Sequence, residues 1–274
     1  MSLAKLCIIL VRPKYSGNIG AAARAMDNFG VQDLRLVEPP AFRRQEAETM
    51  AVHARGVLDR LRIYPSLREA SADCHRVIGT TCRSGLYREG GRAPRSLAAE
   101  LVPTLDLNHS ALVFGPEDTG LTNADLRYCH GVVTIPTAAH FRSLNVAQAV
   151  LICCYELFLA GQATATGDPS SARHPGDGTA PVHVAARELA LAERQEFMYD
   201  KLQQALLKLG FLHRDNPDHI MMAFRRILGR AGLEDRDVRI LLGLARQIDW
   251  YATHGWRSQS SEPARHNTQS AHRK

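Results

Sequence analysis

The 274-residue sequence lacks any CxxC motif and any clustered set of histidine and cysteine residues. Its six cysteines are scattered along the chain, at Cys7, Cys74, Cys82, Cys129, Cys153 and Cys154. Paired or closely spaced ligands would indicate a disulfide framework or a metal site, so the sequence favours neither. Scattered thiols of this kind are typical of buried, reduced cysteines in a cytosolic protein, and we expect no metal.

Long apolar runs are also missing. The apolar stretch near the N-terminus is too short for the hydrophobic region of a signal peptide with a cleavage site. Residues 151–160 are apolar but are interrupted by Glu156, which predicts a core helix and not a membrane span. We therefore expect a cytoplasmic protein with no membrane partner.

The sequence lacks the combination of a GxGxxG motif and an acidic residue after the second strand. This absence disfavours a nucleotide-using α/β enzyme such as a reductase. The chain is basic, with a formal net charge of +6 and an isoelectric point near 9.1. That charge favours a polyanionic partner without establishing one, because many basic proteins never contact nucleic acid.

Strand and helix patterns alternate over residues 1–160, which is typical of a parallel α/β sheet. A chain of 274 residues accommodates one such large domain and a smaller one. Strands are predicted at residues 6–11, 33–37, 76–80, 111–114 and 132–135. Helices are predicted at residues 19–29, 46–57, 67–72, 123–128 and 144–160.

The pattern changes beyond residue 160. Residues 161–181 are rich in Gly, Ala, Ser, Thr and Pro, which predicts a flexible linker. Residues 182–253 contain three amphipathic helical patterns, expected to form a small bundle or a dimer arm. Residues 254–274 are polar and are expected to be a disordered tail. The second helical pattern carries arginines compatible with RNA contact or with a solvated face, namely Arg225, Arg226 and Arg230.

Three segments share one layout, in which an apolar strand leads through a polar or glycine-containing loop into a helix. Each of these strand–loop–helix segments is called a corner below. They cover residues 6–26, 111–126 and 132–157. Each places backbone N–H groups and a helix N-terminus at the end of a buried strand, where an anionic or polar ligand binds favourably. Three such corners in one domain predict a single composite site at one edge of the sheet.

The first corner contains Gly17, Asn18, Gly20 and Arg24. The glycines allow a tight turn and a close approach of the backbone to a ligand. Asn18 is expected at or near the helix N-cap. Arg24 lies in a helix whose other residues are mostly small and apolar. An arginine there is compatible with bidentate binding of a phosphate, with a structural ion pair, or with simple exposure to solvent.

The other two corners supply Glu117, Ser143 and Asn145. Glu117 suits a hydrogen bond from a substrate hydroxyl or an ion pair with Arg24, or else it orders its own loop. Ser143 is expected to be the N-cap of the helix that starts at Leu144, with Asn145 in its first turn. Capping explains Ser143 but not Asn145, which is a poor helix former.

The segments GNIGAAARAM, LVFGPEDTGLT and IPTAAHFRSLNVAQAV resemble, in this order, the three motifs of the SpoU/TrmH branch of the SPOUT RNA methyltransferases. Residues 202–248 resemble the helical extension of the TrmJ group within that branch. The resemblance implies a parallel sheet with a C-terminal trefoil knot, followed by a small all-helical extension. It also implies a homodimer whose active site combines residues of both protomers, with S-adenosylmethionine as the methyl donor.

The reaction that the resemblance implies is methyl transfer to an RNA ribose 2′-hydroxyl. Arg24 would hold the target phosphate and help the hydroxyl lose its proton, by electrostatic positioning because arginine is not a neutral base. Asn18 and Glu117 would orient the hydroxyl and the loops, and Ser143 and Asn145 would lie at the methyl donor and the ribose. The positions that match the cofactor pocket are Thr80, Thr81, Cys82, Gly115, Ile135, Ser143 and Leu144.

RNA contact is expected from Arg24, Arg83, Arg88 and Arg142. The basic segment 83–95 is expected to grip RNA by phosphate contacts and stacking, or else to be a solvated loop. By analogy with the TrmJ group, the expected substrate is tRNA, at C or U as the first anticodon-loop nucleotide. Ribosomal RNA is the alternative, since the motifs determine the reaction and not the substrate. A non-catalytic RNA-binding protein of the same fold would have no need of this set of side chains.

Overall fold

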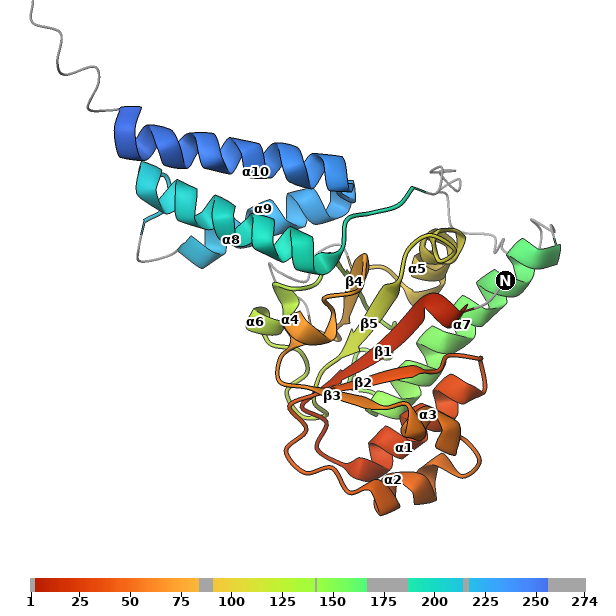
Figure 1. Ribbon diagram of the computed structural model, residues 1–274. Coiled ribbons are helices and arrows are strands. Elements are labelled where there is room, and N and C mark those ends of the chain that lie inside the picture. Colours follow the sequence, from red (N-terminus) through yellow and green to blue (C-terminus); the bar gives the residue numbers. More distant parts are fainter. Residues whose placement is uncertain (1–2, 84–90, 141, 167–186, 214–216, 256–274) are drawn as a thin grey trace, which may run out of the picture.

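The computed structural model describes residues 3–83, 91–140, 142–166, 187–213 and 217–255. Six strands form one parallel sheet in the order β3-β2-β1-β5-β4-β6 (Figure 1). The sheet confirms the predicted α/β class. The strands are β1 Leu6–Val11, β2 Asp33–Val37, β3 Arg62–Tyr64, β4 Arg76–Thr80, β5 Ser110–Phe114 and β6 Gly131–Val133.

The strand β1 lies in the middle of the sheet because both of its faces are apolar. All six of its side chains are fully buried, and they alternate between two separate cores on the two faces. Burying one large aliphatic side chain is worth about 1.5–3 kcal/mol, so this continuous apolar run is most stable where helices cover both faces. The strand's carboxyl end is thereby held rigidly at one edge of the sheet.

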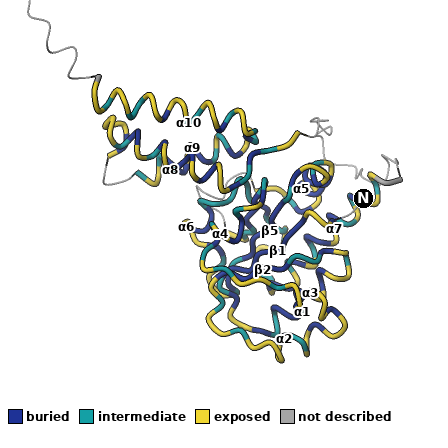
Figure 2. The backbone as a smooth tube through the Cα atoms, viewed as in Figure 1, coloured by how far each residue is buried: buried dark blue, intermediate teal, exposed yellow. Residues whose placement is uncertain are grey.

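Helices cover both faces of the sheet, and the buried layer runs between them (Figures 1 and 2). One face packs against α1 Ser16–Asp27, α2 Arg44–Ala51, α3 Arg55–Asp59, α5 Pro94–Leu101 and α7 Val146–Thr166. The other face packs against α4 Leu67–Ala70, α6 Asn123–Leu126 and the start of α8 Ala192–Leu209.

Several elements differ from the sequence predictions. The short strand β3 and the helix α5 were not expected, and α5 occupies the end of the predicted loop 83–95, with Pro94 in its first turn. The predicted helix 46–57 is divided into α2 and α3 because Val52 has a φ of 58°, which no right-handed helix allows.

Among the described helices, α7 alone is long and apolar enough to cross a bilayer, over Val146–Thr164. It packs against α1 and α5, and its buried face belongs to the larger core, as the predicted core helix requires. The helix continues to Thr166, so the prediction that a linker begins at residue 161 was wrong. Alanine and glutamine in this stretch favour helix more than the composition of the whole segment indicated. Residues 167–181 of the predicted linker lie outside the described residues.

The C-terminal region forms three helices, as predicted: α8, α9 Pro217–Ala231 and α10 Asp235–Trp250. Their shared core is separate from the two cores of the sheet domain. The region nevertheless docks on that domain, because the Ala192 N–H donates to the Cys74 carbonyl at 2.7 Å. Arg225 is buried and paired with Glu196, and it donates to the Arg127 carbonyl at 3.2 Å. Arg225 is therefore an interdomain contact and not part of a solvated or RNA-binding face.

The contact between α1 and α2 gives a test of the packing. A Cβ atom at Gly20 would lie 1.9 Å from the Ala47 carbonyl oxygen, so the two helices cannot stay in place in a Gly20→Ala variant. We expect a loss of at least about 1–3 kcal/mol in the free energy of unfolding, as in other overpacked cores. Urea denaturation followed by circular dichroism measures this loss.

Gly243→Ala is the matched control, because Gly243 lies in α10 with no atom within 4 Å of its added Cβ. There alanine should stabilise the helix by about 0.5–1 kcal/mol. Equal effects of the two substitutions would contradict the close approach of α1 to α2.

Candidate active site

The loops that follow β1, β4, β5 and β6 meet at one edge of the sheet, because these parallel strands all end there. The loops after β4, β5 and β6 enclose a cavity. All seven residues that the resemblance assigns to the methyl-donor pocket line it: Thr80, Thr81, Cys82, Gly115, Ile135, Ser143 and Leu144. The fold thus brings together positions that lie in three separate parts of the sequence.

The cavity combines apolar walls with acidic groups. Phe114, Leu121 and Val133 contribute apolar surface, and Glu117 and Asp118 contribute carboxylates. The Lys14 ammonium lies 2.6 Å from a carboxylate oxygen of Asp118 and lowers the pKa of that carboxyl. Apolar walls beside carboxylates suit a ligand that has both a flat apolar part and a positive charge.

Gly115 is required by the path of the β5–α6 loop. This loop turns back so closely that a Cβ atom on Gly115 would lie 2.2 Å from the Leu121 nitrogen. The turn is closed by the Gly120 N–H, which donates to the Pro116 carbonyl at 2.8 Å. Gly120 has a φ of 62°, which glycine adopts without strain. The loop therefore lines the cavity with its backbone.

A chain of hydrogen bonds joins the three corners. The Asn145 amide donates to Asn18 Oδ1 at 3.0 Å, and the Asn18 amide donates to Glu117 Oε1 at 2.8 Å. The Lys14 N–H donates to the second carboxylate oxygen, Glu117 Oε2, at 3.1 Å. Glu117 accordingly orders the loops, and its contacts are with Asn18 and Lys14 and not with Arg24. An open groove beside the cavity is lined by Tyr15, Asn18, Glu117, Ser143, Leu144, Asn145 and Gln148.

The N-terminus of α7 differs from the prediction. Asn145, and not Ser143, caps the helix, because its Oδ1 accepts from the Ala147 N–H at 2.8 Å. The Asn145 N–H donates to Gln148 Oε1 at 3.3 Å, which completes a reciprocal cap. Asparagine is among the strongest N-cap residues, so capping explains the residue that seemed anomalous in the sequence. Ser143 lies in the preceding loop, at the cavity.

The first corner also begins earlier than predicted. Helix α1 starts at Ser16, and Asn18 lies within its first turn and not at the N-cap. The Ser16 hydroxyl accepts from the Arg43 N–H at 2.8 Å and so ties the helix start to the loop before α2. Since it is not needed for capping, the Asn18 side chain makes the cross-loop contacts.

Arg24 is exposed near the end of α1 and does not line the cavity or the groove of its own chain. Within the described part of the chain its side chain has no ion-pair or hydrogen-bond partner, so the structural ion pair does not occur there. At 3.6 residues per turn, a separation of six residues turns Arg24 about 120° away from Asn18 around the helix. An arginine in this position is available to an external anion.

The other arginines expected to bind RNA are only partly described. Arg83 and Arg142 are exposed, and both line the cavity. Neither has an ion-pair partner among the residues whose structure is described. Arg88 lies outside the described residues, so the role of most of the basic segment 83–95 stays a prediction. Two exposed guanidinium groups at the cavity add positive charge on the side where a polyanion would approach.

Two known protein families match most of the sequence. Residues 5–155 match the family described as SpoU rRNA methylase. The chain belongs to the SpoU rRNA methylase family. Residues 193–263 of this SpoU methylase match a second description, the C-terminal domain of the tRNA methyltransferase TrmJ.

Similar proteins cover nearly the whole chain. The tRNA (cytidine/uridine/adenosine-2′-O-)-methyltransferase TrmJ of Pseudomonas aeruginosa is 36% identical over 243 residues, which are 88% of this chain and 93% of that protein. The tRNA (cytidine/uridine-2′-O-)-methyltransferase TrmJ of Salmonella typhimurium is 34% identical and covers 90% of this chain and 97% of its own. The crystal structure of TrmJ from Z. mobilis ZM4 superposes with a TM-score of 0.73 at 31% identity, over 89% of this chain and 98% of that one.

Some residues at the groove of this SpoU methylase were not predicted from its sequence. Gln148 and Tyr15 line the groove, and the Lys14 backbone orders Glu117. Gln148 was detectable, because an asparagine followed three residues later by glutamine is a capping signature. Tyr15 and Lys14 carry no such local signal, since their contacts depend on the position of the neighbouring corner.

The close turn at Gly115 leads to a prediction about the cavity. In a Gly115→Ala variant the added Cβ must displace the loop around Leu121. We expect S-adenosylmethionine binding, measured by isothermal titration calorimetry, to weaken at least about tenfold, which corresponds to about 1.4 kcal/mol. Gly56→Ala should bind as the unchanged protein does, because Gly56 is on the exposed side of α3 with open space around its Cβ. Unaltered binding by Gly115→Ala would show that this cavity is not the cofactor site.

Proposed function

We propose that this SpoU methylase transfers the methyl group of S-adenosylmethionine to the ribose 2′-hydroxyl of a tRNA, at C or U as the first anticodon-loop nucleotide. The observation that carries the proposal is the hydrogen-bonded chain Asn145–Asn18–Glu117 beside a cavity at the carboxyl edge of a parallel sheet. The names of the TrmJ relatives, which share most of the chain, support the choice of tRNA.

The cavity fits the methyl donor in chemical terms. Its apolar walls at Phe114 and Val133 suit a flat adenine ring, and the carboxylates of Glu117 and Asp118 favour a positively charged sulfonium. When bound there, S-adenosylmethionine supplies an electrophilic methyl group. The backbone of the Gly115 loop would hold it against the β6–α7 loop, where the trefoil knot of SPOUT proteins would lie. No metal is part of this proposed reaction.

The groove next to the cavity is the proposed site of the target ribose. Asn18 and Asn145 present carboxamides there, and Ser143 presents a hydroxyl at the boundary between groove and cavity. Their positions are held by hydrogen bonds and by the α7 cap, so the groups that would orient the 2′-hydroxyl are arranged before substrate arrives. Such prior arrangement reduces the entropy lost on reaching the reactive geometry.

Arg24 would act on the groove of a second protomer. Its side chain lines neither the cavity nor the groove of its own chain, and it is available to bind a phosphate. A guanidinium there would hold the target phosphate and stabilise the developing alkoxide without accepting a proton. A homodimer is further supported by an apolar stripe on α7, where Leu151, Tyr155 and Leu159 follow at four-residue spacing and are each 39–46% exposed.

The direct test of the proposed reaction uses labelled S-adenosylmethionine with unmodified tRNA and rRNA transcripts, followed by nucleoside mapping. We expect 2′-O-methylcytidine or 2′-O-methyluridine at the first anticodon-loop nucleotide of tRNA. Transfer to rRNA alone would show that the proposed reaction is right but that the substrate is rRNA and not tRNA. Cofactor binding without transfer to either RNA would contradict the enzyme assignment.

Replacing Arg24 tests its electrostatic role. Arg24→Ala should lower the methylation rate by about 10²–10³, the usual cost of removing one group that stabilises an oxyanion, and should leave cofactor affinity unchanged. Arg55→Ala is a matched control, because Arg55 is also an exposed arginine on a helix of the same domain. A fully active Arg24→Ala protein would exclude the role given to this residue.

A mixed dimer tests whether the site is shared between protomers. Arg24→Ala and Gly115→Ala chains with different affinity tags are co-expressed and purified through both tags. If Arg24 acts on its partner's groove, one of the two sites in each mixed dimer contains an intact cavity and an intact arginine. At a cofactor concentration too low to fill the Gly115→Ala cavity, both parent proteins should be nearly inactive, and we expect the mixed dimer to show about half of the unchanged activity. Mixed dimers as inactive as their parents would place Arg24 in the site of its own chain.

A further inference from the structure

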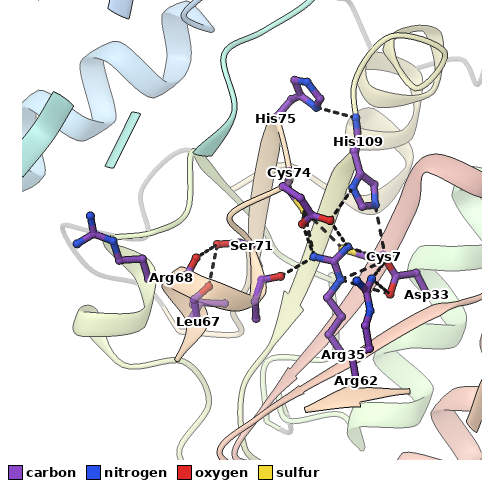
Figure 3. A network of polar contacts seen from close by, with 12 residues as sticks. Cys7, Asp33, Arg35, Arg62, Leu67, Arg68, Ser71, Cys74, His75 and His109 are labelled. Carbon is purple, nitrogen blue, oxygen red and sulfur yellow. Dashed lines mark hydrogen bonds and ion pairs between the residues drawn. The ribbon is translucent and has the colours of Figure 1, made fainter. Parts of the chain in front are cut away.

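A second cluster of reactive side chains lies near the opposite edge of the sheet, where the strands begin (Figure 3). Cys7 is in β1, Cys74 precedes β4, and His109 precedes β5. One ligand atom from each of the three residues lies within 4.8 Å of the others. Both cysteines are fully buried, and the two sulfur atoms are 3.7 Å apart. The proposed methyl transfer uses none of these groups.

We propose that Cys7, Cys74 and His109 bind a zinc ion. The spacing of the donors supports this assignment. Tetrahedral zinc with ordinary bond lengths separates two sulfurs by about 3.8 Å. The Cys7 and Cys74 sulfurs are 3.7 Å apart, and one ring nitrogen of His109 lies within 4.8 Å of both.

The surrounding charges balance such a complex. Two thiolates cancel the charge of a divalent ion, and the charge of the neighbouring buried Arg35 guanidinium is balanced by Asp33 and Asp73. Arg35 is 4.0 Å from Cys74 Sγ and donates to Asp73 Oδ2 at 2.9 Å. Groups that hydrogen-bond to metal ligands orient them, and Arg35 is placed to do so for Cys74.

The imidazole is also held in a suitable orientation. With Nδ1 toward Asp73, the other ring nitrogen of His109 lies 3.8 Å from a carboxylate oxygen of Asp33. A histidine that binds a metal through one nitrogen and faces a carboxylate with the other is a recurrent arrangement. The backbone is held too, because the His109 N–H donates to His75 Nδ1 at 3.0 Å and the His75 N–H donates back to the His109 carbonyl at 2.7 Å.

The cluster is accessible to solvent on one side. The His109 side chain is 20% exposed, and that of the neighbouring Asp73 is 54% exposed. An ion therefore has an entry path to the site from solvent.

This cluster is not visible in the sequence, where no histidine and cysteine ligands are grouped. The three residues come from three separate segments and have no motif spacing. They meet because β1, β5 and β4 are neighbours in the sheet and all begin at the same edge. The number of cysteines and their spacing give no indication of this proximity.

The metal would stabilise the junction with the C-terminal helices. The Cys74 carbonyl accepts from the Ala192 N–H at 2.7 Å. Asn108, next to His109, accepts from the Leu189 N–H at 2.8 Å and donates to the Arg187 carbonyl at 2.9 Å. Cys74 and the neighbour of His109 thus bind the backbone of residues 187–192, the segment that leads into α8. A metal ion that immobilises them would hold the helical region in place.

The test is metal content and affinity of the full-length protein. We expect one zinc ion per chain by mass spectrometry of the purified protein, and affinity is measured by competition with a chromophoric chelator. Loss of an outer partner usually weakens metal binding about 10–100-fold, so removing a direct ligand in His109→Ala or Cys74→Ala should weaken it at least about 100-fold. Cys153→Ala, which removes a buried thiol of α7 far from the cluster in sequence, should bind zinc as the unchanged protein does.

Cobalt substitution gives a readout that does not depend on whether the variants fold. Co²⁺ bound by two thiolates should produce a thiolate-to-metal charge-transfer absorption in the unchanged protein and in Cys153→Ala. No zinc uptake and no such absorption would overturn the proposal. The same applies if hydrogen peroxide, reduced to water, oxidises the two thiols to a Cys7–Cys74 disulfide in a protein that takes up no metal, because the pair would then be a redox couple and not a metal ligand.

Discussion

The parallel pairing of β1 with β5, and of β5 with β4, places the two groups of chemically active residues at opposite edges of the sheet. Strands that run in one direction collect the loops after them at one edge and the segments before them at the other. The first edge brings together the three corners and the chain from Asn145 through Asn18 to Glu117. The second brings together Cys7, Cys74 and His109. Both groups depend on the same strand order, which the apolar faces of β1 stabilise.

The two edges differ in how their charges are satisfied. At the edge where the strands begin, Arg35 is 1% exposed and is paired with both Asp33 and Asp73. Removing such a charge from water is costly, so its partners must lie close and be well oriented. At the functional edge Arg83 and Arg142 are exposed and have no ion-pair partner within the described ranges. The first arrangement stabilises the protein itself, and the second leaves positive charge for a phosphate backbone.

The C-terminal helices are bound to the sheet domain through buried contacts and not merely linked to it. The buried Arg225 side chain of α9 donates to the Arg127 carbonyl of the sheet domain at 3.2 Å, and Glu196 and Tyr199 of α8 hold its guanidinium in place. Gly229 allows α9 to approach His130 closely, since a Cβ there would lie 3.1 Å from the His130 carbonyl oxygen. These contacts fix the helical region near β6, whose carboxyl end leads to the cavity. The orientation of that region relative to the site is therefore determined by packing.

The sequence by itself determined the class of sheet, the three corners and many of the residues that line the cavity and the groove, because apolar periodicity and glycine, asparagine and proline positions act locally. Three of the strands, β1, β2 and β4, have the predicted bounds. Only the tertiary structure decided that Asn18 joins two other corners, that Arg24 faces away from its own groove and that Arg225 is buried. It also decided that Cys7, Cys74 and His109 meet. These outcomes depend on which strands become neighbours, and strand order is set by the packing of the whole core.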